Sequence, residues 1–121
     1  MVLTVDDVFA SDISYRHEPE ETVSGFLIVS KLLTFLCPSE ERRDLSIMVV
    51  APGLRDQWIK HMPPRAGSTV SFAGVATVTG NLCKTGLAPL PYAFVTVRKL
   101  VFQNSHGMQA EYTSVPTDQA R

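Results

Sequence analysis

Two long segments in the second half of the chain alternate between apolar and polar residues. The first is STVSFAGVATVTG at 68–80, and the second is YAFVTVRKLVF at 92–102. A period of two is typical of a strand whose two faces meet different surroundings, so each segment predicts a β-strand. The predicted faces of the second strand are Tyr92, Phe94, Thr96 and Arg98 on one side, and Ala93, Val95, Val97 and Lys99 on the other.

The most apolar stretch, TVSGFLIVSKLLTFLC at 22–37, carries large side chains on both faces. A helix is one interpretation, but its β-branched residues and the following Pro38 favour a single long strand, bent near Gly25. Because a strand that is apolar on both faces must be covered on both, either the rest of the fold or a partner has to cover it. Residues 45–50 form a shorter apolar run that a Pro-Gly pair ends, and they predict another strand.

A short helix is predicted at 54–62, where Leu54 and Trp58 share one stripe and a Pro-Pro pair follows. We expect Trp58 to plug the core rather than to contact a ligand. Residues 80–91 contain two prolines and read as a long loop, and the tetrapeptide NSHG reads as a turn. The segment AEYTSV at 110–115 predicts a short final strand.

Charge is distributed unevenly along the chain. The counts of 11 Lys and Arg against 12 Asp and Glu exclude a uniformly basic protein. Acidic residues gather in 1–30 and basic residues in 31–110, so residues 1–21 are expected to be an acidic arm, looped or loosely docked. The asymmetry fits an anionic partner, an arm that lies over a basic face, or two separate solvated surfaces.

The chain has 121 residues, enough for one domain with one core. We divide it into the acidic N-terminal arm at 1–21, a strand-rich domain at 22–104, and a C-terminal tail or short strand with linker at 105–121. The predicted fold class is all-β, a small closed or partly open β-barrel with one short helix at about 54–62. Four strands are clear; the fifth is either part of 22–37, split by a kink, or the start MVLTV.

Signals for secretion, membranes and disulfides are lacking in the sequence. The start MVLTVDDVFASD has no basic region of the kind that opens a signal peptide, and no apolar run reaches the roughly 18 residues of a membrane span. Cys37 and Cys83 are far apart, and we interpret them as small apolar residues rather than a disulfide. We expect an intracellular protein, cytoplasmic or nuclear, with no membrane partner.

Motifs for catalysis and metal binding are also lacking. The segment GNLCKTG has the wrong spacing for a P-loop, and no Gly-x-Ser-x-Gly elbow occurs. The three histidines are scattered singly, without the paired spacings of zinc ligands. We therefore expect no enzyme activity, no catalytic residues, no cofactor and no metal.

The order of these segments resembles the later half of an OB-fold, the oligonucleotide/oligosaccharide-binding superfamily, over about 22–103. The resemblance rests on a strand ending in VVAPG, a short helix, Pro-Pro, AGSTVSFAGVATV, a long loop and YAFVTVRKLVF. In that family a helix plugs one end of a five-stranded barrel, and a Gly-x-x-Val-x-Phe-x-Gly strand often follows it. The matching positions are Gly67, Val70, Phe72 and Gly74.

The resemblance implies a domain that binds single-stranded DNA or RNA without catalysis, as part of a larger DNA- or RNA-processing protein or complex. Such domains combine aromatic faces for stacking with cations for phosphates, and the loops between strands 1–2 and 4–5 rim the site. Those loops correspond to 38–44 and 80–91. The candidate nucleic-acid-binding residues are Lys31, Arg42, Arg43, Lys84, Tyr92, Phe94 and Arg98.

Two alternatives remain open from the sequence. Tyr92 and Phe94 are candidates for ordinary packing, and the two arginines at 42 and 43 for neutralising the neighbouring glutamates. At the level of function, the alternative is an OB domain for protein–protein assembly that binds no nucleic acid. It would contact a partner protein, or form a homodimer, through the 22–37 strand or the acidic arm.

Overall fold

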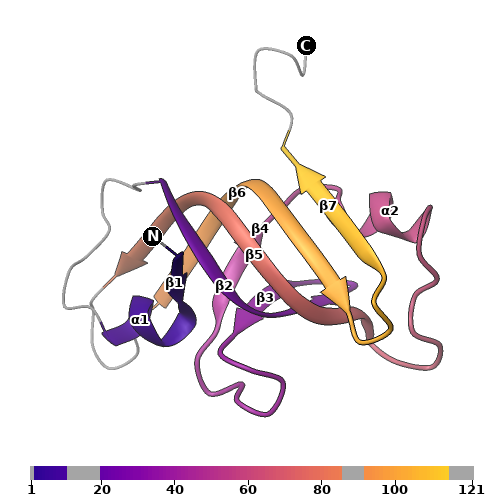
Figure 1. Ribbon diagram of the computed structural model, residues 1–121, viewed down its shortest axis with the longest axis horizontal. Helices are drawn as coiled ribbons and strands as arrows, with labels where there is room; N and C mark the ends of the chain where they lie inside the picture. Colours follow the sequence, from indigo (N-terminus) through magenta and orange to yellow (C-terminus); the bar gives the residue numbers. More distant parts are fainter. Residues whose placement is uncertain (1, 11–19, 86–91, 115–121) are drawn as a thin grey trace.

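A computed structural model describes residues 2–10, 20–85 and 92–114, with the backbone alone at Thr85 and Tyr92. It is a small all-β fold with two short helices, which confirms the predicted fold class (Figure 1). The elements in chain order are β1 (Val2–Thr4), α1 (Val5–Ala10), β2 (Glu20–Ser30), β3 (Thr34–Cys37), β4 (Ile47–Val50), α2 (Leu54–Ile59), β5 (Val70–Thr85), β6 (Tyr92–Asn104) and β7 (Gln109–Thr113).

Five strands form a ring. They pair side by side in the order β2–β3–β4–β6–β5, and β5 pairs back with β2. All neighbours in the ring are antiparallel except β4 and β6, which run parallel. β1 pairs with the first half of β2, and β7 pairs with the second half of β6. Such closure hides the strand edges that would otherwise offer unpaired backbone groups.

The segment 22–37 is a hairpin of β2 and β3 and not one bent strand. The chain reverses at residues 31–33, where the N–H of Ser30 donates to the carbonyl oxygen of Leu33 at 2.9 Å. In return, the N–H of Leu33 donates to Oγ of Ser30 at 3.0 Å. At Gly25, where the sequence predicted a bend, β2 keeps its register with β5. The split supplies the fifth strand of the ring, by one of the two routes that the sequence left open.

The core lies inside the ring and is built from every second residue of its strands. On β5 the predicted alternation is confirmed, since Phe72, Ala76 and Val78 are buried while Val75 is 64% exposed. The other fully buried large side chains include Leu27, Leu36, Ile47, Leu82, Leu100 and Phe102.

Trp58 of α2 closes this core, as predicted. The side chain is 2% exposed, and its ring lies 5.8 Å from that of Phe72 and 4.7 Å from that of Phe102, centroid to centroid. Its Nε1–H donates to the carbonyl oxygen of Glu111 on β7 at 3.1 Å, so the indole joins α2 to β7 as well as to the core.

β6 follows the predicted alternation only as far as Val97, which is buried. Beyond it the register with β5 shifts, because Thr79 pairs with Lys99 while Gly80 pairs with Val97. The register skips Arg98, which forms a β-bulge. The bulge moves Lys99 to the exposed outer face, so the prediction that Lys99 shares a face with Val97 is wrong.

Residues 2–10 of the N-terminal segment are part of the folded domain and not a loosely docked arm. β1 and α1 lie beside β2, and Val5 and Val8 are fully buried in the core (Figure 1). A reciprocal cap fixes the start of α1: the N–H of Thr4 donates to Oδ2 of Asp7 at 2.9 Å, and the N–H of Asp7 donates to Oγ1 of Thr4 at 3.1 Å. Of the rest of the predicted arm, Glu20 and Glu21 begin β2, and residues 1 and 11–19 lie outside the described residues.

We predict that Gly80→Ala destabilises the fold. Gly80 lies at the bulge, where an added Cβ would overlap the carbonyl oxygen of Thr96 on β6. Forcing the two strands apart should lower the free energy of unfolding by about 2 kcal/mol, measured by urea denaturation. Val75→Thr, on the exposed face of the same strand, should change it by no more than about 0.5 kcal/mol. Equal losses in both variants would contradict this account.

Candidate nucleic-acid interface

A groove with a volume of about 680 Å³ lies on the outer face of the β2–β3 hairpin. Its floor is apolar: Ile28 and Cys37 are 4% and 2% exposed, and Phe35 is partly buried beside them. Two cations, Lys31 and Arg43, line the same groove and are exposed. The arrangement joins an apolar surface with positive charge.

The cross-strand register extends this floor into an apolar row. Phe35 of β3 pairs with Met48 of β4, which pairs with Phe94 of β6. Partners in register project to the same face of a sheet, so these three side chains lie in line on the outer surface of the ring. All three are partly buried, and each keeps some exposed surface. Because neighbouring strands lie about 4.8 Å apart, the two phenylalanines are separated by roughly 10 Å.

Of the seven predicted residues, two line the groove, and a third lies at the far end of the apolar row. Lys31 lies in the β2–β3 turn, Arg43 lies in the β3–β4 loop, and Phe94 lies in the apolar row. Across the described ranges, neither Lys31 nor Arg43 forms an ion pair with a carboxylate. The side chain of Tyr92 lies outside the described part of the chain.

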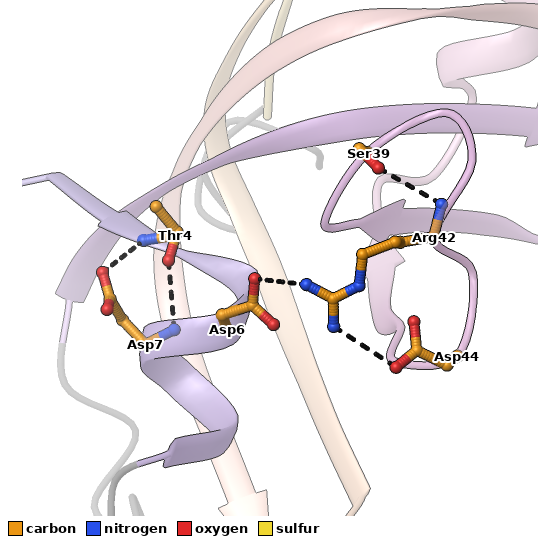
Figure 2. A network of polar contacts seen from close by, with 6 residues as sticks. All are labelled: Thr4, Asp6, Asp7, Ser39, Arg42 and Asp44. Atoms are coloured by element: carbon orange, nitrogen blue, oxygen red, sulfur yellow. Dashed lines mark hydrogen bonds and ion pairs between the residues drawn. The ribbon is translucent and has the colours of Figure 1, made fainter.

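Arg42 and Arg98 are each held by carboxylates. Nη1 of Arg42 contacts Oδ2 of Asp6 at 2.9 Å, and its Nη2 contacts Oδ2 of Asp44 at 3.3 Å (Figure 2). These hydrogen bonds raise the pKa of Arg42 and lower the pKa of Asp44. Nη2 of Arg98 contacts Oε1 of Glu20 at 2.9 Å. Both arginines therefore have their charge offset, and neither lines the groove.

The prediction that Lys84 lies in an exposed loop is wrong. β5 continues through this position, so Lys84 faces inward and is 4% exposed. Its Nζ donates to the carbonyl oxygen of Val8 at 2.9 Å and reaches that of Phe9 at 3.5 Å, in the last turn of α1. Carbonyls at the end of a helix lack intrahelical donors, and a cation there is favourable. Lys84 serves the fold.

Sequence reasoning missed Phe35 and Met48. Counting by twos along a single strand at 22–37 puts Phe35 on the same face as Leu27, but the turn at 31–33 reverses that relation. In the folded chain Leu27 is buried in the core, while Phe35 points outward beside Ile28. In the sequence, the only indication was that both faces of 22–37 are apolar. This pattern does not show where the chain turns.

Three further features of the described residues concern the cysteines, metal ligands and membrane spans. Cys37 and Cys83 are free thiols, as expected. Among the residues with described positions, no group of three His, Cys, Asp or Glu side chains is arranged to hold a metal ion. No helix in the described ranges has the length and apolar character needed to cross a bilayer.

Comparison with known proteins gives no relative for this chain: no family model, no curated protein and no solved structure matches it. The candidate site therefore rests on the chain's own geometry.

We predict that Lys84→Met lowers the stability of the protein. The substitution keeps an apolar stem but removes the donor, which leaves buried carbonyl groups of α1 without their partner. The free energy of unfolding should fall by about 1–3 kcal/mol in urea denaturation. Lys60→Met, at an exposed position after α2, is the control and should have little effect. An unchanged stability for Lys84→Met would show that the contact contributes nothing.

We predict that Cys37 reacts slowly with alkylating reagents. Burial raises the pKa of this thiol, and the nearby Arg43 offsets the rise only in part. Because the thiolate is the reactive form, labelling of Cys37 in the folded protein should begin at higher pH than labelling of a free thiol. Mass spectrometry after timed alkylation measures this, with urea-unfolded protein as the control. Equal rates in both states would contradict the burial of Cys37.

Proposed function

We propose that this protein is a non-catalytic domain that binds single-stranded nucleic acid through the groove on β2–β3 and the adjoining apolar row. One observation carries the proposal: Lys31, Arg43 and the partly exposed Phe35 line one groove. Bases stack on aromatic faces while cations track the phosphates, which is the combination that unspecific strand binding requires.

The connectivity of the ring supports the same proposal. An OB-fold is a five-stranded Greek-key barrel that binds oligonucleotides on strands 2–3 and on the loops between strands 1–2 and 4–5. If β2 is counted as the first strand, strands 2 and 3 are β3 and β4, which carry Phe35 and Met48. The loop between strands 1 and 2 is then the turn at 31–33 and not 38–44 as predicted. The loop between strands 4 and 5 begins after Thr85, and residues 86–91 lie outside the described residues.

The charges set an expectation for affinity. Each phosphate neutralised on a single strand changes the logarithm of the binding constant by about −0.7 per tenfold increase in salt. Two groove cations should therefore give a slope of about −1.4. Stacking contributes about 1–3 kcal/mol per base, so we expect micromolar rather than nanomolar binding.

Fluorescence polarisation of a labelled single strand of mixed sequence tests the proposal. The wild-type protein should bind at low salt, and the double variant Lys31→Ala/Arg43→Ala should lose the salt dependence. Phe35→Leu keeps an apolar side chain but removes the aromatic stacking surface, so it should weaken binding about tenfold at unchanged salt slope, within the range of stacking energies.

Lys60→Ala is the matched control, because it removes an exposed cation that does not line the groove. A duplex of the same sequence should bind more weakly than the single strand. If the wild-type protein fails to bind at tens of micromolar at low salt, the proposal is wrong for this domain.

A second candidate function, protein–protein assembly, is favoured by a separate observation. Leu32 and Leu33 at the tip of the hairpin are 90% and 45% exposed, next to the apolar groove. Exposed apolar surface of this kind is typical of contact sites for another chain.

For self-association, light scattering at high protein concentration should give twice the mass of one chain. Leu32→Ser should return it to the mass of one chain, because the contact surface loses its most exposed apolar side chain. A single-chain mass for the wild type at all concentrations would remove the homodimer.

A further inference from the structure

One arginine joins the N-terminal unit to the loop that borders the groove. Asp6 lies on α1, and Arg42 lies in the β3–β4 loop, 36 residues further along the chain. The guanidinium bridges Asp6 and Asp44 at 2.9 and 3.3 Å, as Figure 2 shows. Because α1 is anchored by its buried valines and by the contact with Lys84, Asp6 is a fixed point for the loop.

The same β3–β4 loop contains Arg43, which lines the groove. The backbone N–H of Arg42 donates to Oγ of Ser39 at 3.2 Å, so Arg42 is held by its main chain as well as by its side chain. The next residue, Arg43, donates from Nε to the carbonyl oxygen of Glu40 at 3.3 Å and lines the groove. Any movement of Arg42 is passed on to Arg43 through one peptide unit.

We infer that Arg42 is a positioning residue: held by Asp6 and Asp44, it fixes the loop so that Arg43 faces the groove. The N-terminal unit of β1 and α1 thereby supports ligand binding without touching the ligand. This inference rests on the proposed function for the nature of the ligand. It differs from the sequence-based prediction, in which Arg42 is itself a nucleic-acid-binding residue.

The direction in which Asp6→Asn changes the affinity distinguishes a positioning role from a purely electrostatic effect. Asp6→Asn removes a negative charge from a protein that would bind a polyanion. If Asp6 acts only through its charge, the variant should bind a single strand more tightly, because less repulsion remains. If Asp6 holds Arg42 in place, the variant should bind more weakly, since the loop loses its anchor on α1.

Polarisation with the labelled single strand measures this direction. We expect Asp6→Asn to weaken binding about threefold, the scale of an exposed ion pair. In an Arg43→Ala background the same substitution should have no further weakening effect, because the group that it positions is gone. Asp56→Asn, on the exposed surface of α2, is the control and should leave affinity unchanged or slightly higher. Tighter binding by Asp6→Asn, or equal weakening in both backgrounds, overturns the inference.

Hydrogen exchange tests the same link without any ligand. The amide of Arg42 is protected by Ser39 in a loop anchored on Asp6. In Asp6→Asn this amide should exchange several times faster than in the wild type, while the amide of Val95 in β6 should not change. If the wild-type protein binds no single-stranded nucleic acid, the proposed function is wrong. The exchange result still shows whether Asp6 holds Arg42 in place. Unchanged exchange at Arg42 overturns it.

Discussion

The pairing of β5 along both of its edges is the constraint on which the structure depends. β5 has 16 residues and pairs with β2 on one side and β6 on the other. These two pairings close the ring, and only a closed ring gives the inward residues a common interior. Gly74 and Gly80 lie where the backbone of β6 approaches β5 too closely for a side chain. The core, the outer face and the groove all follow from this closure.

Three cations of this protein are held by contacts within the fold. Acidic residues near the N-terminus meet basic residues of the middle in two ion pairs, Asp6 with Arg42 and Glu20 with Arg98. A third cation, Lys84, is buried against the end of α1. Exposed ion pairs of this kind contribute little to stability singly, but they decide which cations remain open to an anionic ligand. Among the described cations that form no ion pair, Lys31 and Arg43 are the two that line the groove.

The apolar excess of the first hairpin has two uses. Leu27, Val29 and Leu36 fill the interior of the ring, and Ile28 and Cys37 form the floor of the groove on the other side. The chain's own fold therefore covers one face of this hairpin, for which the sequence had left open a cover by the rest of the fold or by a partner. Leu32 is the clear exception, and its position at the tip of a tight turn leaves it in solvent.

Local pattern was sufficient for much of the fold. The alternation on β5 and in the first half of β6, the helix with its buried Trp58, and the strand at Ile47–Val50 are each encoded by the spacing of neighbouring residues. The helix α1 in the acidic N-terminal segment was not predicted, because six residues with two buried valines show too little periodicity to indicate a helix.

The site depended on information that local pattern does not contain. The turn at 31–33 has the sequence Lys-Leu-Leu, without glycine, proline or asparagine, and it alone places Phe35 on the outer face. The bulge at Arg98 and the inward turn of Lys84 follow from the register between strands that lie far apart in the sequence. The sequence by itself determined that this is a small all-β protein with one tryptophan-plugged core, since periodicity and burial are local properties. Only the tertiary structure decided which cations and aromatic residues share a surface, because that depends on long-range pairing.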